Sequence, residues 1–353
     1  MNKNISGIDL FSGAGGLSLG AEMAGIHVRY AVENEKNAAT TYRLNHKKTI
    51  VIEKDIRCVN TNEIKVDSDK CILFGGAPCQ GFSTSNRRTS NKNNPQNWLF
   101  REFIRFLQSI KPEFFVFENV TGLAELNSGE FLDLILDEFK TNGYACSYDI
   151  LNAADLGVPQ NRKRLFIVGS RSGLKVNLAC KKKRKQVTVM EAFQGLPLLE
   201  NGAAIDIMPY SEEATNVYSR KLRGKLNYCT GNLVSKNAPY ILDRYQHIQQ
   251  GENWTAIPEE LMNNYTDTSK CHTGIYYRLR ADQPSVVIGN YRKNMLIHPF
   301  QDRGLSVREA ARLQSFPDKY VFTGSIGFQQ QQVGNAVPPV LAKYVFDAIK
   351  REL

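Results

Sequence analysis

The chain has 353 residues, of which 42% are hydrophobic and 23% charged, and its formal net charge is +10. This length can bury one large core or two unequal ones. The absence of any run of about 18 apolar residues argues against a membrane span. The excess of Lys and Arg favours a polyanionic partner. The seven cysteines form no C-x-x-C pair, so we expect neither a metal site nor a disulfide framework.

We expect no export signal at the start of the chain. Residues Met1–Gly7 lead directly into a strand-like segment, which leaves no room for the apolar core of a signal peptide. Scattered cysteines are also typical of a reducing compartment. We therefore expect a cytoplasmic protein.

The first half of the chain alternates between strand-like and helical segments. Apolar runs predict strands, and the patterned segments between them predict helices. This alternation is typical of a mostly parallel sheet with helices on both faces, which binds ligands at the carboxyl ends of its strands. The predicted strands are Gly7–Phe11, His27–Val32, Lys70–Phe74, Phe114–Phe117 and Leu165–Val168, and two of the predicted helices are Asn97–Ile110 and Gly129–Asn142.

The character of the sequence changes at the basic run Lys181–Lys185. Beyond it the segments are irregular and richer in Asn and Tyr, until helical patterns return at Ser306–Ser315 and Val340–Glu352. We therefore expect two domains, a larger one over residues 1–178 that residues 320–353 complete, and a smaller one over residues 179–319. The basic run is either a solvated linker or a contact to backbone phosphates.

A glycine-rich turn, in the segment Asp9–Gly20, follows the first predicted strand. Its glycines allow a sharp turn and close approach to a ligand, although a plain connection from strand to helix can have the same composition. Glu33 ends the next strand and suits a ribose diol, and Asp55 follows one unit later, so the three features favour an adenosine-containing ligand. The adjacent pair Gly15-Gly16 departs from the spacing of pyrophosphate-binding turns, which favours S-adenosylmethionine over a nicotinamide cofactor.

Three further segments bring reactive or charged side chains to strand ends. Cys79 follows a buried strand and precedes a polar stretch, a place for an exposed thiolate nucleophile or for a structural cysteine in a turn. Glu118 ends another apolar strand, either as a functional carboxylate or as a polar cap. Arg162 and Arg164 precede the strand Leu165–Val168 and, if that strand starts early, point to one side, where they could pair with an anion or hold a carbonyl.

In combination these segments resemble one family. DLFSGAGGLSLG, GGAPCQGFS, FENV, QNRKR, REAARLQSFPD and QVGNAVPP occur in the order seen in DNA (cytosine-5)-methyltransferases, from Asp9 to Pro339. The resemblance, to the bacterial restriction-modification type, implies an α/β fold with a Rossmann-like S-adenosylmethionine-dependent methyltransferase sheet and a second, smaller target-recognition domain. Residues 1–178 and 320–353 would then form the catalytic and cofactor-binding domain, and residues 179–319 would recognise the target and return to the shared scaffold.

The resemblance also implies a role for each matching residue. Cys79 looks like the nucleophile that adds to carbon 6 of a cytosine flipped out of the duplex. Glu118 is similar to the acid that holds ring nitrogen 3 and the exocyclic amine, and Arg164 resembles the residue that binds the base's oxygen, with Arg162 supporting the site. The positions that match the S-adenosylmethionine site are Phe11, Gly13, Gly15, Gly16, Leu17, Glu33, Asn34, Asp55, Ile56, Pro78, Leu99, Asn335 and Ala336.

The chain departs from the family ahead of Trp98-Leu99-Phe100, where Asn94 and Gln96 stand in the places of an acid and an arginine. The polar stretch Ser83–Gln96 resembles the loop that closes over a flipped base. Because Asn94 and Gln96 replace the charged residues there, we expect this loop to close differently. The central stretch, residues 181–272, matches the target-recognition region in place only and gives no recognition sequence. Its candidates for phosphate or base contacts, which ordinary surface and core residues would also fit, are Tyr210, Tyr218, Tyr228, Arg220, Lys221, Arg223 and Lys225.

Three other functions share part of this pattern. A tRNA cytosine-5 methyltransferase can use the same scaffold, although the sizeable central region argues against it. The intact set of Cys79, Glu118 and Arg164 argues against a catalytically silent DNA-binding relative, and an unrelated nucleotide-dependent enzyme leaves Pro78-Cys79-Gln80 unexplained. For the favoured function we expect duplex DNA as substrate, a monomer, no membrane contact and a place near the nucleoid. A cognate restriction endonuclease, where one exists, would act on the same site without direct contact.

Overall fold

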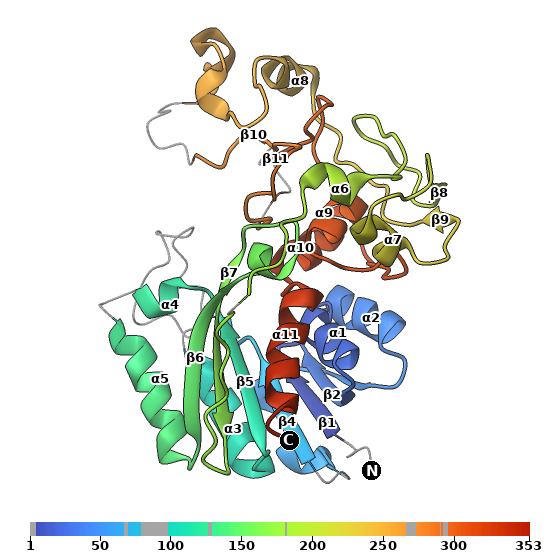
Figure 1. Ribbon diagram of the computed structural model, residues 1–353. Helices are drawn as coiled ribbons and strands as arrows, with labels where there is room; N and C mark the ends of the chain where they lie inside the picture. Colours follow the sequence, from blue (N-terminus) through green and yellow to red (C-terminus); the bar gives the residue numbers. More distant parts are fainter. Residues whose placement is uncertain are drawn as a thin grey trace. The chain divides into compact units, whose positions relative to one another are not determined.

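The computed structural model describes residues 5–66, 70–78, 98–125, 129–180, 182–265, 273–289, 291 and 296–353, which form two compact units (Figure 1). Unit 1 comprises residues 1–156, 163–183 and 337–353, and unit 2 comprises residues 157–162 and 184–336. These boundaries differ from the ones expected at residues 178 and 320. The assignment of the two expected domains to catalysis and target recognition stays a prediction.

Unit 1 is built on a seven-stranded sheet in the order β3-β2-β1-β4-β5-β7-β6. Neighbouring strands are parallel except that β7 runs antiparallel to both β5 and β6, which confirms the expected mostly parallel α/β sheet. The strands are β1 (Ile5–Leu10), β2 (His27–Glu33), β3 (Ile50–Glu53), β4 (Lys70–Gly75), β5 (Phe114–Asn119), β6 (Ala145–Asn152) and β7 (Lys163–Ser170).

Helices from both ends of the chain meet on this unit. Gly20 allows α1 to pack closely on α11, because a Cβ atom there would lie 2.4 Å from the Ala342 side chain. The end of the chain thus returns to the first helix (Figure 1). The helices of unit 1 are α1 (Gly16–Met23), α2 (Lys36–Asn45), α3 (Phe100–Ile110), α4 (Gly122–Glu125), α5 (Glu130–Thr141) and α11 (Pro339–Lys350), with the short 3₁₀ helices η1 (Ile56–Cys58), η2 (Thr61–Glu63) and η7 (Ala153–Leu156).

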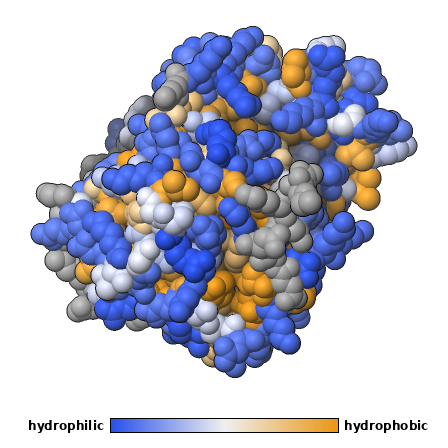
Figure 2. All heavy atoms as spheres, turned by 60° about the horizontal axis from the view of Figure 1, so that its bottom comes forward, coloured by the Kyte–Doolittle hydropathy of each residue, from blue (hydrophilic) through white to orange (hydrophobic). Residues whose placement is uncertain are grey.

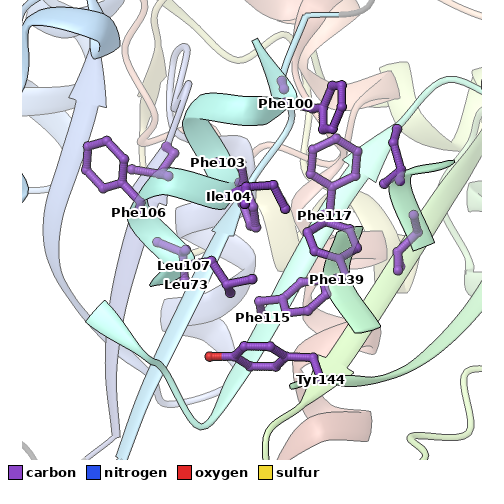
Figure 3. Close-up of a cluster of buried hydrophobic side chains, with 14 of the residues drawn as sticks. Leu73, Phe100, Phe103, Ile104, Phe106, Leu107, Phe115, Phe117, Phe139 and Tyr144 are labelled. Carbon is purple, nitrogen blue, oxygen red and sulfur yellow. The ribbon is translucent and has the colours of Figure 1, made fainter. Parts of the chain in front are cut away.

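The core beside β4 and β5 is largely aromatic (Figure 3). Phe103 of α3 packs edge-on against Phe117 of β5, with ring centroids 5.2 Å apart, and Phe115 lies 4.2 Å from Phe139 of α5. Fully burying one such side chain contributes about 1.5–3 kcal/mol. This packing fixes β5, whose end carries the candidate residue Glu118.

Hydrophilic residues cover most of the face drawn in Figure 2, and hydrophobic residues form separate areas between them. Across the part of the chain that the structure describes, no helix combines the length and the apolar character needed to cross a membrane.

Unit 2 consists of short elements joined by long irregular segments. Two small two-stranded sheets pair β8 with β9 and β10 with β11. The elements are α6 (Val189–Phe193), β8 (Met208–Pro209), α7 (Val217–Arg223), β9 (Tyr228–Cys229), α8 (Pro239–Gln246), η8 (Trp254–Ala256), η9 (Glu259–Met262), β10 (Tyr277–Arg278), β11 (Leu296–Ile297), α9 (Val307–Leu313) and α10 (Ile326–Asn335).

Two buried ion pairs stabilise the segment that follows β11. Arg303 donates to both carboxylate oxygens of Glu309, at 2.9 and 2.7 Å, and Arg312 donates to both oxygens of Asp318, at 2.9 and 2.6 Å. Glu309 also closes a capping box with Ser306 at the start of α9. Breaking a buried pair costs about 3–5 kcal/mol. The REAARLQSFPD segment therefore serves the folding of unit 2.

The His298 ring, stacked on Phe193, makes the stability of unit 2 depend on pH. Burial lowers the pKa of His298 to about 4, although the nearby Glu309 opposes the shift. The folded unit therefore keeps the ring neutral, whereas the unfolded chain binds a proton below about pH 6.5. We expect the free energy of unfolding to have its full value above about pH 6.5 and to fall by up to about 3 kcal/mol as the pH drops to about 4.

The test uses His298→Asn, which removes the titrating ring and keeps an acceptor for the Phe300 N–H group. This acid slope should flatten in the variant, even though the lost stacking lowers stability at every pH. Urea unfolding in a Trp98→Phe background leaves Trp254, in unit 2, as the only tryptophan of the chain. An equally steep slope in the variant would assign the pH dependence to another group.

Candidate active site

The carboxyl ends of the parallel strands β1, β2, β4 and β5 lie along one edge of the unit 1 sheet. Because β7 is antiparallel, its first residues reach the same edge, and Leu165 stands opposite Asn119 in register. The candidate residues Phe11, Glu33 and Arg164 lie at or next to these strand ends. The edge therefore gathers side chains that are far apart in the sequence, as expected for ligand sites in such sheets.

The glycine-rich turn begins at Phe11, directly after β1. Phe11 has φ 57°, a left-handed conformation that strains a residue with a side chain, and Gly13 and Gly15 have φ 54° and 87°. Gly15 caps the amino end of α1, and its N–H donates to the Ser12 carbonyl at 2.9 Å. The turn thus points the first amides of α1 toward the carboxyl edge, a favourable place for a polar ligand.

Glu33 holds this turn against the end of β2. Its two carboxylate oxygens accept the N–H groups of Gly13, at 2.7 Å, and of Glu35, at 2.8 Å. Burial raises the pKa of Glu33, and these backbone hydrogen bonds oppose the increase. Each carboxylate oxygen can accept a second hydrogen bond. Glu33 can therefore still accept from a ligand's hydroxyl groups.

Two observations on the turn fit a cofactor there. The Ser12 hydroxyl is buried and has no hydrogen-bond partner among the described residues. The side of Gly13 on which a Cβ atom would lie is open, with no described atom within 4 Å. A buried polar atom without a partner calls for an explanation, and a ligand that lies over the turn supplies one.

The remaining cofactor candidates of unit 1 differ in their exposure and in their contacts. Asp55 caps η1 and binds its own neighbour Arg57 through both carboxylate oxygens, and this pairing lowers the pKa of Asp55 to about 2. Ile56 and Leu17 are buried, and Asn34 is exposed. The other members of the set that lie in unit 1 are Gly16, Leu99 and Pro78, and Leu99 packs against the aromatic core.

Glu118 and Arg164 form an ion pair across the ends of β5 and β7. The Arg164 Nε lies 3.0 Å from Glu118 Oε1, and the two side chains are 15% and 11% exposed. Burial lowers the pKa of Arg164, while Glu118 opposes the decrease. Arg164 also donates to the Lys163 carbonyl at 2.8 Å. The sequence predicted both residues, and the structure brings them together at the edge.

Two residues with no role predicted from the sequence also belong to this edge. A Cβ atom on Gly76 would lie 2.6 Å from Glu118 Oε2, so the carboxylate rests against the backbone after β4. The Asn119 side chain donates to the Ala77 carbonyl at 3.1 Å. The signal that could have found them is their position beside Cys79 and Glu118 in two of the motifs.

Cys79 lies outside the described residues, and so do the stretch Ser83–Gln96 and the substituted positions Asn94 and Gln96. Two other cysteines are poor nucleophiles, because burial raises the pKa of Cys71 to about 12 and that of Cys146 to about 11. Within the described ranges, no three His, Cys, Asp or Glu side chains form a group that could hold a metal ion.

Arg162, Asn335 and Ala336 belong to unit 2. β7 begins at Lys163, so strand alternation does not extend to Arg162. The Arg162 guanidinium is buried and donates to the carbonyls of Ile288 and Gly334, at 3.1 and 3.0 Å. Arg162 thereby fixes the residue next to Asn335 within unit 2. Their roles toward a base or a cofactor stay predictions.

The candidates for nucleic-acid contacts divide into two groups. Tyr210 and Tyr218 use their hydroxyls inside unit 2, on Asp318 at 2.7 Å and on the Arg312 carbonyl at 2.6 Å. Arg223 stacks on Tyr210 and donates to backbone carbonyls. These three side chains therefore hold unit 2 together. The exposed candidates are Tyr228, Arg220, Lys221 and Lys225.

A family model for C-5 cytosine-specific DNA methylases matches residues 5–351. The chain is 34% identical over 367 residues to the Type II methyltransferase M.DdeI of Desulfomicrobium norvegicum, covering 97% of this chain and 88% of that protein. It is 37% identical over 352 residues to M1.HphI of Haemophilus parahaemolyticus, covering 97% and 86%.

Two solved structures are similar to this chain. A prophage-encoded protein of E. coli described as a DNA modification methyltransferase has a TM-score of 0.78 and 26% identity, with 98% of this chain and 99% of that chain covered. The Entamoeba histolytica methyltransferase EhMeth, at 16% identity, covers 99% of each chain with a TM-score of 0.61 and shares the fold.

Proposed function

The chain belongs to the C-5 cytosine-specific DNA methylase family and is a DNA (cytosine-5)-methyltransferase, and from this premise we propose its reaction. A methyl group passes from S-adenosylmethionine to carbon 5 of one specific cytosine in duplex DNA. The observation that carries the proposal is the Glu118–Arg164 ion pair at the carboxyl edge, beside the strand that leads to Cys79.

Cys79 is the proposed nucleophile. Carbon 5 of cytosine is a poor nucleophile until a group adds at carbon 6. A new bond from the Cys79 sulfur to carbon 6 moves ring electron density to carbon 5, which makes carbon 5 reactive. When carbon 5 takes up the methyl group, S-adenosylhomocysteine is the other product. The carbon 5 proton then passes to water, and the ring double bond re-forms. The carbon–sulfur bond breaks in that step and the thiolate is regenerated.

Glu118 and Arg164 hold the base during this sequence. Glu118 is proposed to bind ring nitrogen 3 and the exocyclic amine, and Arg164 the base's carbonyl oxygen, so that the charge developing on the ring is stabilised. Such contacts typically contribute about 3–4 kcal/mol to the lowering of a barrier. The face of the ring at which Cys79 would add is covered inside a stacked duplex, so the base must flip out, at a cost of about a few kcal/mol.

S-adenosylmethionine, when bound, supplies a methyl group activated by its sulfonium sulfur. Glu33 is proposed to accept the ribose hydroxyls, and the turn from Phe11 to Gly15 to cover the cofactor. The proposal is supported by the Ser12 hydroxyl without a partner among the described residues and by the open side of Gly13.

Glu33→Gln is expected to weaken the binding of S-adenosylhomocysteine by about 10–100-fold, because hydrogen bonds to a charged group contribute about 1.5–3 kcal/mol. The glutamine amide would also turn a donor toward one of the two backbone N–H groups. Calorimetric titration of the protein without DNA measures this effect independently of activity. Glu53→Gln, opposite Glu33 in register but paired with Arg43 at the surface, is the control. Equal affinities in wild type and Glu33→Gln would remove Glu33 from the cofactor site.

We also propose that the protein acts as a monomer in the cytoplasm, near the nucleoid, and that its target site coincides with that of any cognate restriction endonuclease, without direct contact. The Type II methyltransferases among its relatives support the restriction-modification role.

Bisulfite mapping in a host without cytosine methylation tests the function as a whole. We expect unconverted cytosines at one recurring sequence in the DNA of cells that express the chain, and fully converted tRNA from the same cells. Protection of tRNA with fully converted DNA would favour the RNA-modifying alternative, and full conversion of both would contradict methyl transfer.

A further inference from the structure

The Asn119 side chain joins the ends of β4 and β5 in unit 1. It is buried, its Nδ2 donates to the Ala77 carbonyl at 3.1 Å, and its Oδ1 accepts the Val120 N–H at 2.9 Å. Because one partner is an acceptor and the other a donor, only one orientation of the carboxamide satisfies both. Asn119 therefore fixes the backbone at Ala77 relative to the end of β5.

The residue before Ala77 makes a second contact with β5. The backbone of Gly76 comes so close to Glu118 that a Cβ atom there would lie 2.6 Å from Oε2. Glu118 is at the same time held by Arg164. Two successive residues after β4 thus contact two successive side chains of β5, and the position of one segment sets the position of the other.

We propose that Asn119 is a positioning residue for the reaction. By holding Ala77, it fixes the described end of the segment that leads to Cys79 relative to the Glu118 carboxylate, with Gly76 leaving the space for that carboxylate. The inference rests on the proposed function, since it gives Cys79 and Glu118 their roles. A misplacement of about 1 Å can slow a reaction about 100-fold.

The Asn119→Asp variant tests the positioning role, because the aspartate side chain has nearly the same shape as that of asparagine. The introduced carboxyl still accepts from Val120, but when ionised it turns an oxygen toward the Ala77 carbonyl, and two acceptors repel each other. When protonated, it donates to that carbonyl as the amide does, and burial favours the protonated form. We expect kcat to be about 100-fold below wild type at pH 8 and to recover, relative to wild type, as the pH falls. The KM values for DNA and cofactor should change by less than about threefold.

Two further variants separate positioning from general damage. Asn119→Ala should have a low kcat at every pH, because the alanine side chain cannot donate a hydrogen bond to the Ala77 carbonyl. Asn142→Asp is the matched control, since the Asn142 amide also donates to a carbonyl, that of Glu138 at the end of α5. This control should keep wild-type kcat. Wild-type kcat for Asn119→Asp at pH 8, or a slow rate without recovery at lower pH, would overturn the proposal.

Gly76→Ala keeps the proposal testable should the Asn119 variants fail to fold. The added Cβ clashes only with the far end of the Glu118 side chain, so thermal stability should stay near that of wild type while kcat falls by about 10-fold or more. Unchanged kcat would count against the proposal.

The rate at which the covalent adduct forms on duplex DNA containing 5-fluorocytosine distinguishes failure of the proposed function from failure of the positioning role. If the wild type forms no adduct, the proposed function fails. If the wild type and Asn119→Asp form it equally fast at pH 8, only the positioning role fails.

Discussion

Cys79→Ser is expected to lower kcat for methyl transfer by at least about 1,000-fold while the affinity for duplex DNA stays within about twofold of wild type. A serine hydroxyl has a far higher pKa than a thiol, so it supplies almost no anion to add to carbon 6. Removal of a nucleophile typically costs several orders of magnitude in kcat. The change removes no positive charge and no phosphate contact, so binding should persist.

Single-turnover transfer of a labelled methyl group and a DNA gel-shift assay measure the two quantities separately. Cys58→Ser, at an exposed cysteine in η1, is the control and should behave as wild type. Turnover of Cys79→Ser within about tenfold of wild type would remove Cys79 from the mechanism.

Glu118→Gln is the second change with a large expected effect. It keeps the shape of the side chain but removes the negative charge that faces Arg164 at 3.0 Å and that is proposed to bind the exocyclic amine. Loss of one preorganised group of this kind typically lowers kcat about 100–1,000-fold. The cofactor affinity should be unchanged, because Glu33 and its turn belong to other strand ends.

Glu113→Gln provides a matched control from the opposite ends of the same two strands. Glu113, just before β5, pairs with Arg171, just after β7, at 3.6 Å. Its loss should leave kcat within about twofold of wild type. A comparable decrease for both variants would indicate damage to the sheet rather than to a site, and a kcat for Glu118→Gln near wild type would contradict its role.

The sequence predicted the centre of the unit 1 sheet because its strands are apolar. β1, β2, β4, β5 and β7 all correspond to predicted strands, with small differences at their ends. β3 and β6 were missed, and both are edge strands. Tyr148 and Ile150 of β6 are 53% and 39% exposed, because an edge strand buries less of its apolar side chains than a central strand does. The sequence of β6 therefore gives only a weak strand signal.

The sequence predicted those site residues that lie at the ends of apolar strands. Glu33 and Glu118 follow apolar runs, and the expectation that strand ends meet at one edge located them without knowledge of their partners. The contacts of Asn119 with Ala77 and of Arg162 with Ile288 and Gly334 join residues far apart in the chain. Neither periodicity nor composition carries such pairings, so the sequence alone could not give them.

Unit 2 illustrates the same limit. Tyr210 and Arg223 have the composition of a nucleic-acid surface, yet they pack on each other, and the Tyr210 hydroxyl binds Asp318. Aromatic and cationic side chains serve an interior ion network as readily as a phosphate backbone. Only the folded contacts tell the two uses apart.

Covalent trapping on duplex DNA that carries 5-fluorocytosine at the mapped target site tests the central claim most directly. The fluorine at carbon 5 cannot leave as a proton does, so the bond between the Cys79 sulfur and carbon 6 should persist after methylation. We predict a denaturation-resistant complex that needs S-adenosylmethionine and is absent in Cys79→Ser. A wild-type protein that turns over unmodified target DNA but leaves no such complex on the fluorinated duplex would contradict the account.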